Sequence, residues 1–166
     1  MEKIEILVTG GTFDKEYDEL TGRLFFRATH LPEMLALGRC GLPVAVRRLM
    51  MMDSLDMGPR DRRRILDACL RSRSRRIVVT HGTDTMVETA RLLGPRVAGK
   101  TVVLTGAMVP YKFGSSDGLF NLGSALSFVQ TLPPGVFVAM NGRCLPWDRV
   151  RKDRARGVFV LDRRVS

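Results

Sequence analysis

Two short glycine loops, each ending in a threonine, are the segments of this sequence best suited to chemistry. They are Thr9-Gly10-Gly11-Thr12 and Thr80-His81-Gly82-Thr83, and the residue types at 9, 11 and 12 recur at 80, 82 and 83. Glycine lets the backbone approach a ligand closely and frees N–H groups that can bind an anion. A single loop of this kind could owe its glycine to turn geometry alone. Two copies that each end in a hydroxyl favour a site for a carboxylate or for an oxyanion that develops during acyl transfer.

A threonine hydroxyl attacks a carbonyl carbon only when a base takes its proton, and the sequence offers few candidate bases. His30 and His81 are its only histidines, and we expect His81 to pack or cap rather than to act as the base. The remaining groups are Asp84 at the end of the second loop, Lys152 and Tyr17. Taken alone, Lys152 would be a solvated lysine and Tyr17 a surface tyrosine. The sequence therefore predicts a hydroxyl nucleophile that works without histidine.

The sequence gives little support to a dinucleotide or zinc site, because the pattern GxGxxG and the zinc motif HExxH do not occur. The spacing GxxxxGK followed by Thr occurs once, at 94–101, but it precedes a predicted strand, whereas a phosphate-binding loop follows a strand and opens a helix. The three cysteines, Cys40, Cys69 and Cys144, have no CxxC spacing and are too few for a disulfide framework. We therefore expect no cofactor, no metal and reduced cysteines.

The elements that must position these loops follow an α/β pattern, in which short runs rich in valine and isoleucine alternate with segments of helical period. We predict strands at 4–9, 44–50, 76–80, 101–105 and 136–140, and helices at 31–37, 59–71, 84–93 and 119–132. The Arg47-Arg48 pair makes 44–50 the expected edge strand, and residues 14–27 are predicted to form a flap hairpin. The fold class is a doubly wound, mostly parallel sheet, flavodoxin-like or Rossmann-like. Such a sheet binds its ligand at the carboxyl ends of its strands, where both glycine loops fall.

Length and composition place further limits on the protein. The 166 residues are 45% hydrophobic and 27% charged, which predicts one globular domain over residues 1–166. No apolar run approaches the roughly 18 residues of a membrane span, and the first residues lack the layout of a signal peptide. We therefore expect a cytoplasmic protein that does not bind a membrane.

The charge balance is unusual, since 27 Lys and Arg residues against 17 Asp and Glu give a net charge of +10. Such an excess raises nucleic acid as a partner. Two basic stretches, 71–76 and 149–154, carry much of it, but they contain no interleaved aromatic residues. Stretches of this kind are more often solvated faces, so a nucleic-acid partner is the weaker prediction.

In combination, these residues resemble the bacterial-type L-asparaginase family, whose members carry one threonine in a Thr-Gly-Gly-Thr loop and another in His-Gly-Thr-Asp-Thr. The corresponding segments here are 9–12 and 81–85. Further similar segments follow in the same order: Ser54-Leu55-Asp56-Met57, Leu104-Thr105-Gly106-Ala107-Met108-Val109-Pro110, Ser116-Asp117-Gly118, Asn121-Leu122, and Met140-Asn141 followed by Lys152. The match covers nearly the whole chain, and several motifs in order are a specific signal.

The resemblance implies hydrolysis of L-asparagine to L-aspartate and ammonia, without metal or cofactor and with weak or no activity on glutamine. It implies that Thr12 is the primary nucleophile, that Thr83, Asp84 and Lys152 form a threonine-aspartate-lysine group, and that the flap contributes Tyr17. For the substrate it implies binding of the α-groups by Ser54 and Asp84, of the amide by the Ala107 carbonyl, and of the oxyanion by backbone N–H groups. The expected donors are the N–H of Gly11 in the first loop and the N–H of Thr83, which follows Gly82, in the second loop. Gly11 and Gly82 are both expected to border the substrate. Which threonine attacks first stays open.

The sequence departs from most of that family in three ways. Most members have a second domain that supplies acidic residues to the site, whereas this sequence is similar to a short, single-domain form. Tyr17 follows Thr12 by only five positions, and Leu55 stands where the family usually has a polar residue. We expect a homo-oligomer, a dimer or tetramer, in which a neighbouring subunit could complete the site. The alternative is a catalytically reduced module that binds an amino acid or takes part in an amidotransferase assembly.

Overall fold

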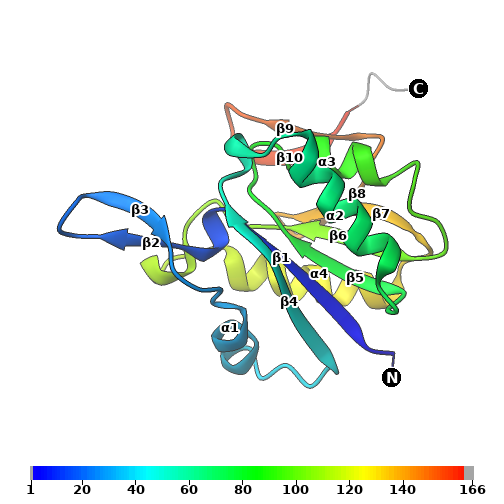
Figure 1. Ribbon diagram of the computed structural model, residues 1–166, viewed down its shortest axis with the longest axis horizontal. Coiled ribbons are helices and arrows are strands. Elements are labelled where there is room, and N and C mark those ends of the chain that lie inside the picture. Colours follow the sequence, from blue (N-terminus) through cyan, green and yellow to red (C-terminus); the bar gives the residue numbers. More distant parts are fainter. Residues whose placement is uncertain (1, 163–166) are drawn as a thin grey trace.

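The computed structural model describes residues 2–162 and centres on a six-stranded sheet (Figure 1). Its strands are β1 (Ile4–Gly10), β4 (Val44–Met52), β5 (Arg76–Thr80), β6 (Thr101–Thr105), β7 (Gly135–Met140) and β8 (Arg143–Pro146), in the spatial order β4-β1-β5-β6-β7-β8. The first five are parallel and β8 is antiparallel to β7. In chain order the parallel strands run 2-1-3-4-5, which is the flavodoxin-like arrangement. The predicted fold class and the predicted edge strand are both confirmed.

Helices cover both faces of the sheet because its central strands are apolar on both sides. Helices α2 (Pro59–Arg71) and α3 (Met86–Leu93) pack on one face, and α1 (Leu31–Leu37) and α4 (Gly118–Thr131) on the other. In β5, for example, Ile77 and Val79 join the first core while Val78 joins the second. Two cores therefore hold the sheet rigid, and the loops at its carboxyl edge are anchored to it.

Two hairpins form separate two-stranded sheets beside the central one. Strands β2 (Lys15–Asp18) and β3 (Arg23–Phe26) form the predicted flap, which projects away from the body of the molecule (Figure 1). Strands β9 (Val150–Asp153) and β10 (Val158–Leu161) form a second hairpin, which was not predicted. The charged run of β9 is typical of a solvated segment, and only Val150 and Phe159 reveal a buried side. Short 3-10 turns complete the fold at Thr12–Asp14, Ser54–Asp56 and Tyr111–Phe113.

The predicted bounds need small corrections. Helix α3 begins at Met86, so Asp84 precedes the helix instead of starting it, because Thr85 is non-helical and bonds outward to the carbonyl of Ser54. Strand β4 runs to Met52, two residues further than predicted, and α4 covers 118–131. Within residues 2–162 no helix combines the length and apolar character needed to cross a bilayer.

Candidate active site

The two glycine loops meet at the carboxyl edge of the sheet, between the neighbouring strands β1 and β5. Gly11 has φ of 80°, and a Cβ there would overlap the backbone of Gly82. A Cβ on Gly82 would in turn overlap the side chain of Ser54. Glycine is therefore required at both positions so that the two loops can approach each other closely. Thr12 and Thr83 each directly follow one of these glycines, so they start from neighbouring points. This is the topological switch point, where a doubly wound sheet binds its ligand.

Lys152 joins the second loop through its ammonium group. Its Nζ lies 2.8 Å from Oγ1 of Thr83 and 2.8 Å from Oδ1 of Asp84. The Lys152 side chain is 9% exposed, and that of Asp84 is 37% exposed. The structure thus brings together Thr83, Asp84 and Lys152, although Lys152 is distant from the other two in the sequence. Because Lys152 Nζ contacts both other groups, the ammonium can give a proton to the Asp84 carboxylate and then accept one from the Thr83 hydroxyl.

Arg154 is a second cation at Asp84. Its guanidinium donates to the Asp84 carbonyl at 3.3 Å and lies 4.0 Å from the Asp84 carboxylate. Arg154 follows Lys152 closely on the same hairpin, so both cations reach one carboxylate. No role was predicted for Arg154, because an arginine in a basic stretch carries no signal of a specific partner.

The Ser54 hydroxyl lies beside Gly82, at the contact between the two glycine loops. Ser54 is 1% exposed, and its Oγ has no hydrogen-bond partner among the described residues. Its backbone carbonyl accepts the Thr85 hydroxyl at 2.8 Å, which ties the Ser54 turn to the second loop. A buried hydroxyl without a partner loses hydration and gains nothing in return unless a ligand supplies the bond. Ser54 therefore has the character of a ligand-binding group.

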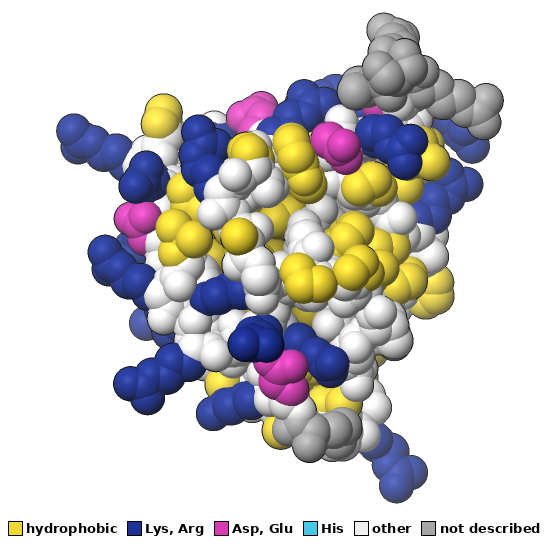
Figure 2. Space-filling view, turned by 90° about the vertical axis from the view of Figure 1, so that its right-hand side faces the viewer, with side chains coloured by type: hydrophobic (Ala, Val, Ile, Leu, Met, Phe, Trp, Pro, Cys, Tyr) yellow, Lys and Arg dark blue, Asp and Glu magenta, His cyan; other side chains and the backbone are white. Residues whose placement is uncertain are grey.

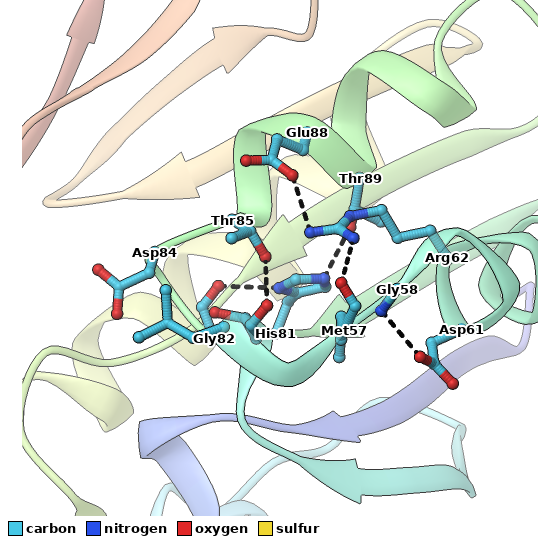
Figure 3. A network of polar contacts seen from close by, with 12 residues as sticks. Met57, Gly58, Asp61, Arg62, His81, Gly82, Asp84, Thr85, Glu88 and Thr89 are labelled. Atoms are coloured by element: carbon cyan, nitrogen blue, oxygen red, sulfur yellow. Dashed lines mark hydrogen bonds and ion pairs between the residues drawn. The ribbon is translucent and has the colours of Figure 1, made fainter.

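His81 supports the second loop from behind (Figure 3). Its Nδ1 lies 2.8 Å from the Gly82 carbonyl and its Nε2 lies 2.8 Å from the Thr89 hydroxyl. Burial lowers the pKa of His81 to about 4, so the ring is neutral at pH 7. Nδ1 then donates to Gly82 and Nε2 accepts from Thr89. The expectation that His81 caps and does not act as a base agrees with these contacts.

Arg62 closes the outer side of this network, where its guanidinium donates to the Met57 carbonyl and to Glu88 at 2.8 Å (Figure 3). The Arg62 side chain is only 12% exposed. These contacts link α2, the Ser54 turn and α3, so the second loop rests on a cross-linked base.

The loop after β6 is the third wall of the site. Ala107 is buried, and Asp117 accepts the N–H groups of Met108 and Val109 at 2.9 and 3.0 Å. Asn121 donates to the Gly106 carbonyl at 2.9 Å and accepts the N–H of Asn141 at 3.1 Å.

Asn141 continues that chain of bonds, since its side chain accepts the N–H of Phe159 at 3.0 Å. Because Phe159 lies on β10, the network joins the Ala107 loop to the hairpin that carries Lys152. Asn121 and Asn141 both occur in the motifs quoted above, but no role was predicted for either. The φ of 56° at Asn141 is a left-handed turn that asparagine tolerates.

Thr12 begins the turn after β1, and its hydroxyl makes no hydrogen bond within the described residues. The first loop differs from expectation in one donor: the N–H of Gly11 is already bonded to the Met52 carbonyl at 3.0 Å, so it is not free for an oxyanion. The reason is the parallel ladder, which extends past β1 along β4. The N–H groups of Thr12 and Thr83 have no carbonyl acceptor in the described part of the chain.

Tyr17 lies apart from the other candidates. It is 54% exposed on β2, and its hydroxyl has no hydrogen bond among the described residues. The base of the flap is nevertheless tied to the site, because Lys15 forms an ion pair with Asp53, the residue before Ser54. Asp53 also accepts the N–H of Leu55 at 3.0 Å and so caps the Ser54 turn. Direct contacts bring together Gly11, Gly82, Ser54, Thr83, Asp84 and Lys152. Thr12 and Ala107 adjoin this group through the neighbouring Gly11 and Gly106, and Tyr17 lies apart.

The chemistry of the site is that of polar and hydroxyl groups. Among the described residues, no three His, Cys, Asp or Glu side chains gather as metal ligands. The cysteine thiols are free, and burial raises the pKa of Cys69 to about 12 and that of Cys144 to about 11, so neither is a thiolate at neutral pH. The arrangement therefore offers two threonine hydroxyls, one lysine, backbone donors and a buried serine hydroxyl without a partner.

Comparisons with known proteins show which family the sequence matches. The family model for the N-terminal part of asparaginases matches residues 3–162. The L-asparaginase of Thermococcus kodakarensis is 30% identical over 161 residues, covering 94% of this chain and 49% of the relative. One subunit of the glutamyl-tRNA(Gln) amidotransferase of Methanococcus vannielii is 32% identical over 152 residues, 86% of this chain and 35% of that protein.

Solved asparaginase structures share this fold. The structure of the Thermococcus kodakarensis enzyme superposes with a TM-score of 0.84 at 31% identity, covering 96% of this chain and 51% of that one. A probable cytoplasmic L-asparaginase of Campylobacter jejuni gives 0.82 at 29% identity, over 97% and 53% of the two chains. The chain spans about half the length of these asparaginases.

Proposed function

This chain belongs to the asparaginase family, where it corresponds to the N-terminal part of the family's members, and we propose that it hydrolyses the side-chain amide of L-asparagine to L-aspartate and ammonia. The observation that carries the proposal is the contact of Lys152 Nζ with both the Thr83 hydroxyl and the Asp84 carboxylate. The fold does not require such a group at the edge of the sheet, but the group is suited to proton transfer at a threonine hydroxyl.

In the proposed reaction the Thr12 hydroxyl attacks the side-chain carbonyl carbon, and the C–N bond breaks as a proton passes to the departing ammonia. Water then attacks the ester on Thr12, which releases aspartate and restores the hydroxyl. Thr83, held by Lys152, relays the protons. The free N–H groups of Thr12 and Thr83 stabilise the oxyanion, and each donor of this kind typically contributes about 3 to 4 kcal/mol.

Substrate binding rests on the groups around this centre. The unpartnered hydroxyl of Ser54 donates a bond to the α-carboxylate, and Asp84 holds the α-ammonium. The Ala107 carbonyl accepts a hydrogen bond from the amide. Gly11 and Gly82 let the two loops and the Ser54 turn pack together, so that their backbone borders the substrate. Tyr17 reaches the site only if the flap moves, and we include it in the proposal on that condition. Glutamine is one methylene longer, and such a difference is worth only about 1 to 3 kcal/mol in a pocket.

The proposal is tested by ammonia release from asparagine and glutamine. We expect Thr12→Val and Lys152→Met to lose activity on the order of 10³-fold or more while remaining folded. Thr131→Val and Lys112→Met are the matched controls, since both residues lie on the surface outside the site, on α4 and after Pro110. Full activity in either site variant would overturn the assignment.

A second candidate is an amino-acid-binding or amidotransferase-associated module with reduced catalysis. The similarity to a protein of an amidotransferase favours it. It predicts that asparagine or aspartate raises the melting temperature without any release of ammonia. The intact Thr83-Asp84-Lys152 contact favours the enzyme.

We place this activity in the cytoplasm, in line with the description of the Campylobacter jejuni relative as a probable cytoplasmic enzyme. We also propose a homo-oligomer, dimer or tetramer, in which a neighbouring subunit contributes to the site. Mass in solution, measured together with activity, tests the second statement.

A further inference from the structure

The excess positive charge of the protein is concentrated in one groove. Two adjoining hollows, of about 650 and 390 Å³, share Arg47 and Arg71 in their walls and run along the edge strand β4 beside α2. Eight cationic and two anionic side chains line them, a net charge of +6 out of the +10 of the whole chain. We call this the arginine groove.

The helical period explains one wall of the groove. Arg60, Arg64 and Arg71 lie four and seven residues apart on α2, so they share one helix face over roughly 16 Å. The opposite wall is β4, where the side chains of Arg47 and Arg48 are exposed. The buried stripe of α2, with Ile65, points to the core, so the arginines are directed away from it.

Most of these cations have no protein partner. Glu5 pairs with Arg47 at 2.7 Å and Asp67 with Arg63 at 3.0 Å, which uses both acidic groups of the groove. Among the described residues, six cations of the groove form no ion pair: Lys3, Arg48, Arg60, Arg64, Arg71 and Arg73. Like charges at this density repel one another, so the arrangement gains stability from a bound anion.

The remaining lining indicates which anion fits. The groove contains no aromatic side chain, and Leu49, Pro59 and Ala68 are its main apolar residues. A protein partner would need a buried apolar or aromatic anchor, which the groove does not offer. Guanidinium groups alone suffice for phosphates, because they bind phosphate oxygens in a bidentate manner. Without aromatics there is no stacking of bases.

We propose that the arginine groove binds nucleic acid through its phosphate backbone, without reading the base sequence. The site lies along β4 and α2, whereas the candidate active site lies at the carboxyl edge between β1 and β5, so the proposal does not depend on the proposed activity. On the face shown in Figure 2, Lys and Arg side chains gather around the margin and far outnumber Asp and Glu. The groove is distinguished from that general surface by its two facing walls.

The experiment measures fluorescence anisotropy of a labelled 20-nucleotide RNA and of the same sequence as single-stranded DNA, between 50 and 200 mM salt. If all six unpaired cations contact phosphates, log Kd should rise with log salt with a slope of about 4. The triple variant Arg60→Gln, Arg64→Gln, Arg71→Gln should bind at least about tenfold more weakly at 50 mM salt, and its slope should fall by about 2. Ammonia release should be unchanged.

The matched control is Arg23→Gln, Arg39→Gln, Arg96→Gln, which removes the same charge from exposed positions outside the groove. Equal losses in the two triple variants would show binding by overall charge and would overturn the proposal. No binding by the wild type at 50 mM salt would overturn it as well. Polyglutamate of equal charge that competes as well as RNA would assign the groove to an acidic protein and would also contradict it.

Discussion

The Nδ1 atom of His81 lies 2.8 Å from the carbonyl oxygen of Gly82, and this contact sets the direction of the next peptide N–H. Because a trans peptide is planar, its C=O and N–H point in opposite directions. With the Gly82 carbonyl held toward the buried ring, the N–H of Thr83 faces the other way, toward the candidate site. His81, which the sequence predicts to pack or cap, thus acts as a positioning residue for the proposed oxyanion donor.

Burial of His81 predicts a dependence of stability on pH. Its pKa falls from 6.5 to about 4, so between these values the unfolded chain binds more protons than the folded one. Stability should therefore be full above pH 6.5 and fall as the pH drops toward 4, by up to about 3 kcal/mol from this group. Urea denaturation from pH 4 to 7.5 measures it. His81→Gln should flatten the part of the curve between pH 4.5 and 6.5, and an unchanged curve would contradict the prediction.

Removal of the Ser54 hydroxyl should separate stability from function. Because Ser54 Oγ is buried without a partner, Ser54→Ala should leave the free energy of unfolding unchanged or raise it by about 1 kcal/mol. The KM for asparagine should rise at least tenfold, since the substrate loses a bond. Thermal unfolding and steady-state kinetics give the two values. Ser124→Ala serves as the control and should change neither, since Ser124 is half-buried on α4 and its hydroxyl bonds only within that helix. A large loss of stability in Ser54→Ala would refute this account.

Close approach of the two loops should make Gly11 intolerant of substitution. In Gly11→Ala both the φ of 80° and the overlap with Gly82 oppose the new Cβ, and we expect a loss of about 3 kcal/mol or more. Gly99 is the matched control, because its φ is 70° but no atom lies within 4 Å of a Cβ. Gly99→Ala should lose only about 1 kcal/mol. Equal effects in denaturant titrations would mean that conformation alone, and not the loop contact, requires glycine.

Replacement of the side-chain amide nitrogen of Asn121 by oxygen should lower the stability of the protein. Asn121→Asp keeps the size but replaces the amide that donates to Gly106 and to Asp117 at 2.8 Å. A buried carboxylate would then face a carbonyl and a second carboxylate, which should lower the free energy of unfolding by about 3 to 5 kcal/mol. Because protonation relieves the repulsion, the deficit should shrink at low pH. A variant as stable as the wild type at pH 7.5 would show that the network does not hold the Ala107 loop.

The sequence by itself determined the order of the five parallel strands and the four helices, and the loops that lie at the carboxyl edge. Runs such as 76–80 and 101–105 are apolar on both faces, and glycine with threonine at their ends marks the carboxyl edge, because these local patterns survive without knowledge of the partner strands. Motif order then predicted Thr12 as the nucleophile and Thr83, Asp84 and Lys152 as one group, and the last three are in contact.

Only the tertiary structure decided what surrounds those residues. Strand β9, which brings Lys152 and then Arg154 to Asp84, has a single apolar residue, Val150, so the sequence there showed no strand periodicity. The occupied N–H of Gly11, the unpartnered hydroxyl of Ser54 and the arginine groove depend on which segments pack together. Hydrogen-bond partners and unpaired charges are properties of contacts between distant segments, and a sequence read along one dimension does not contain them.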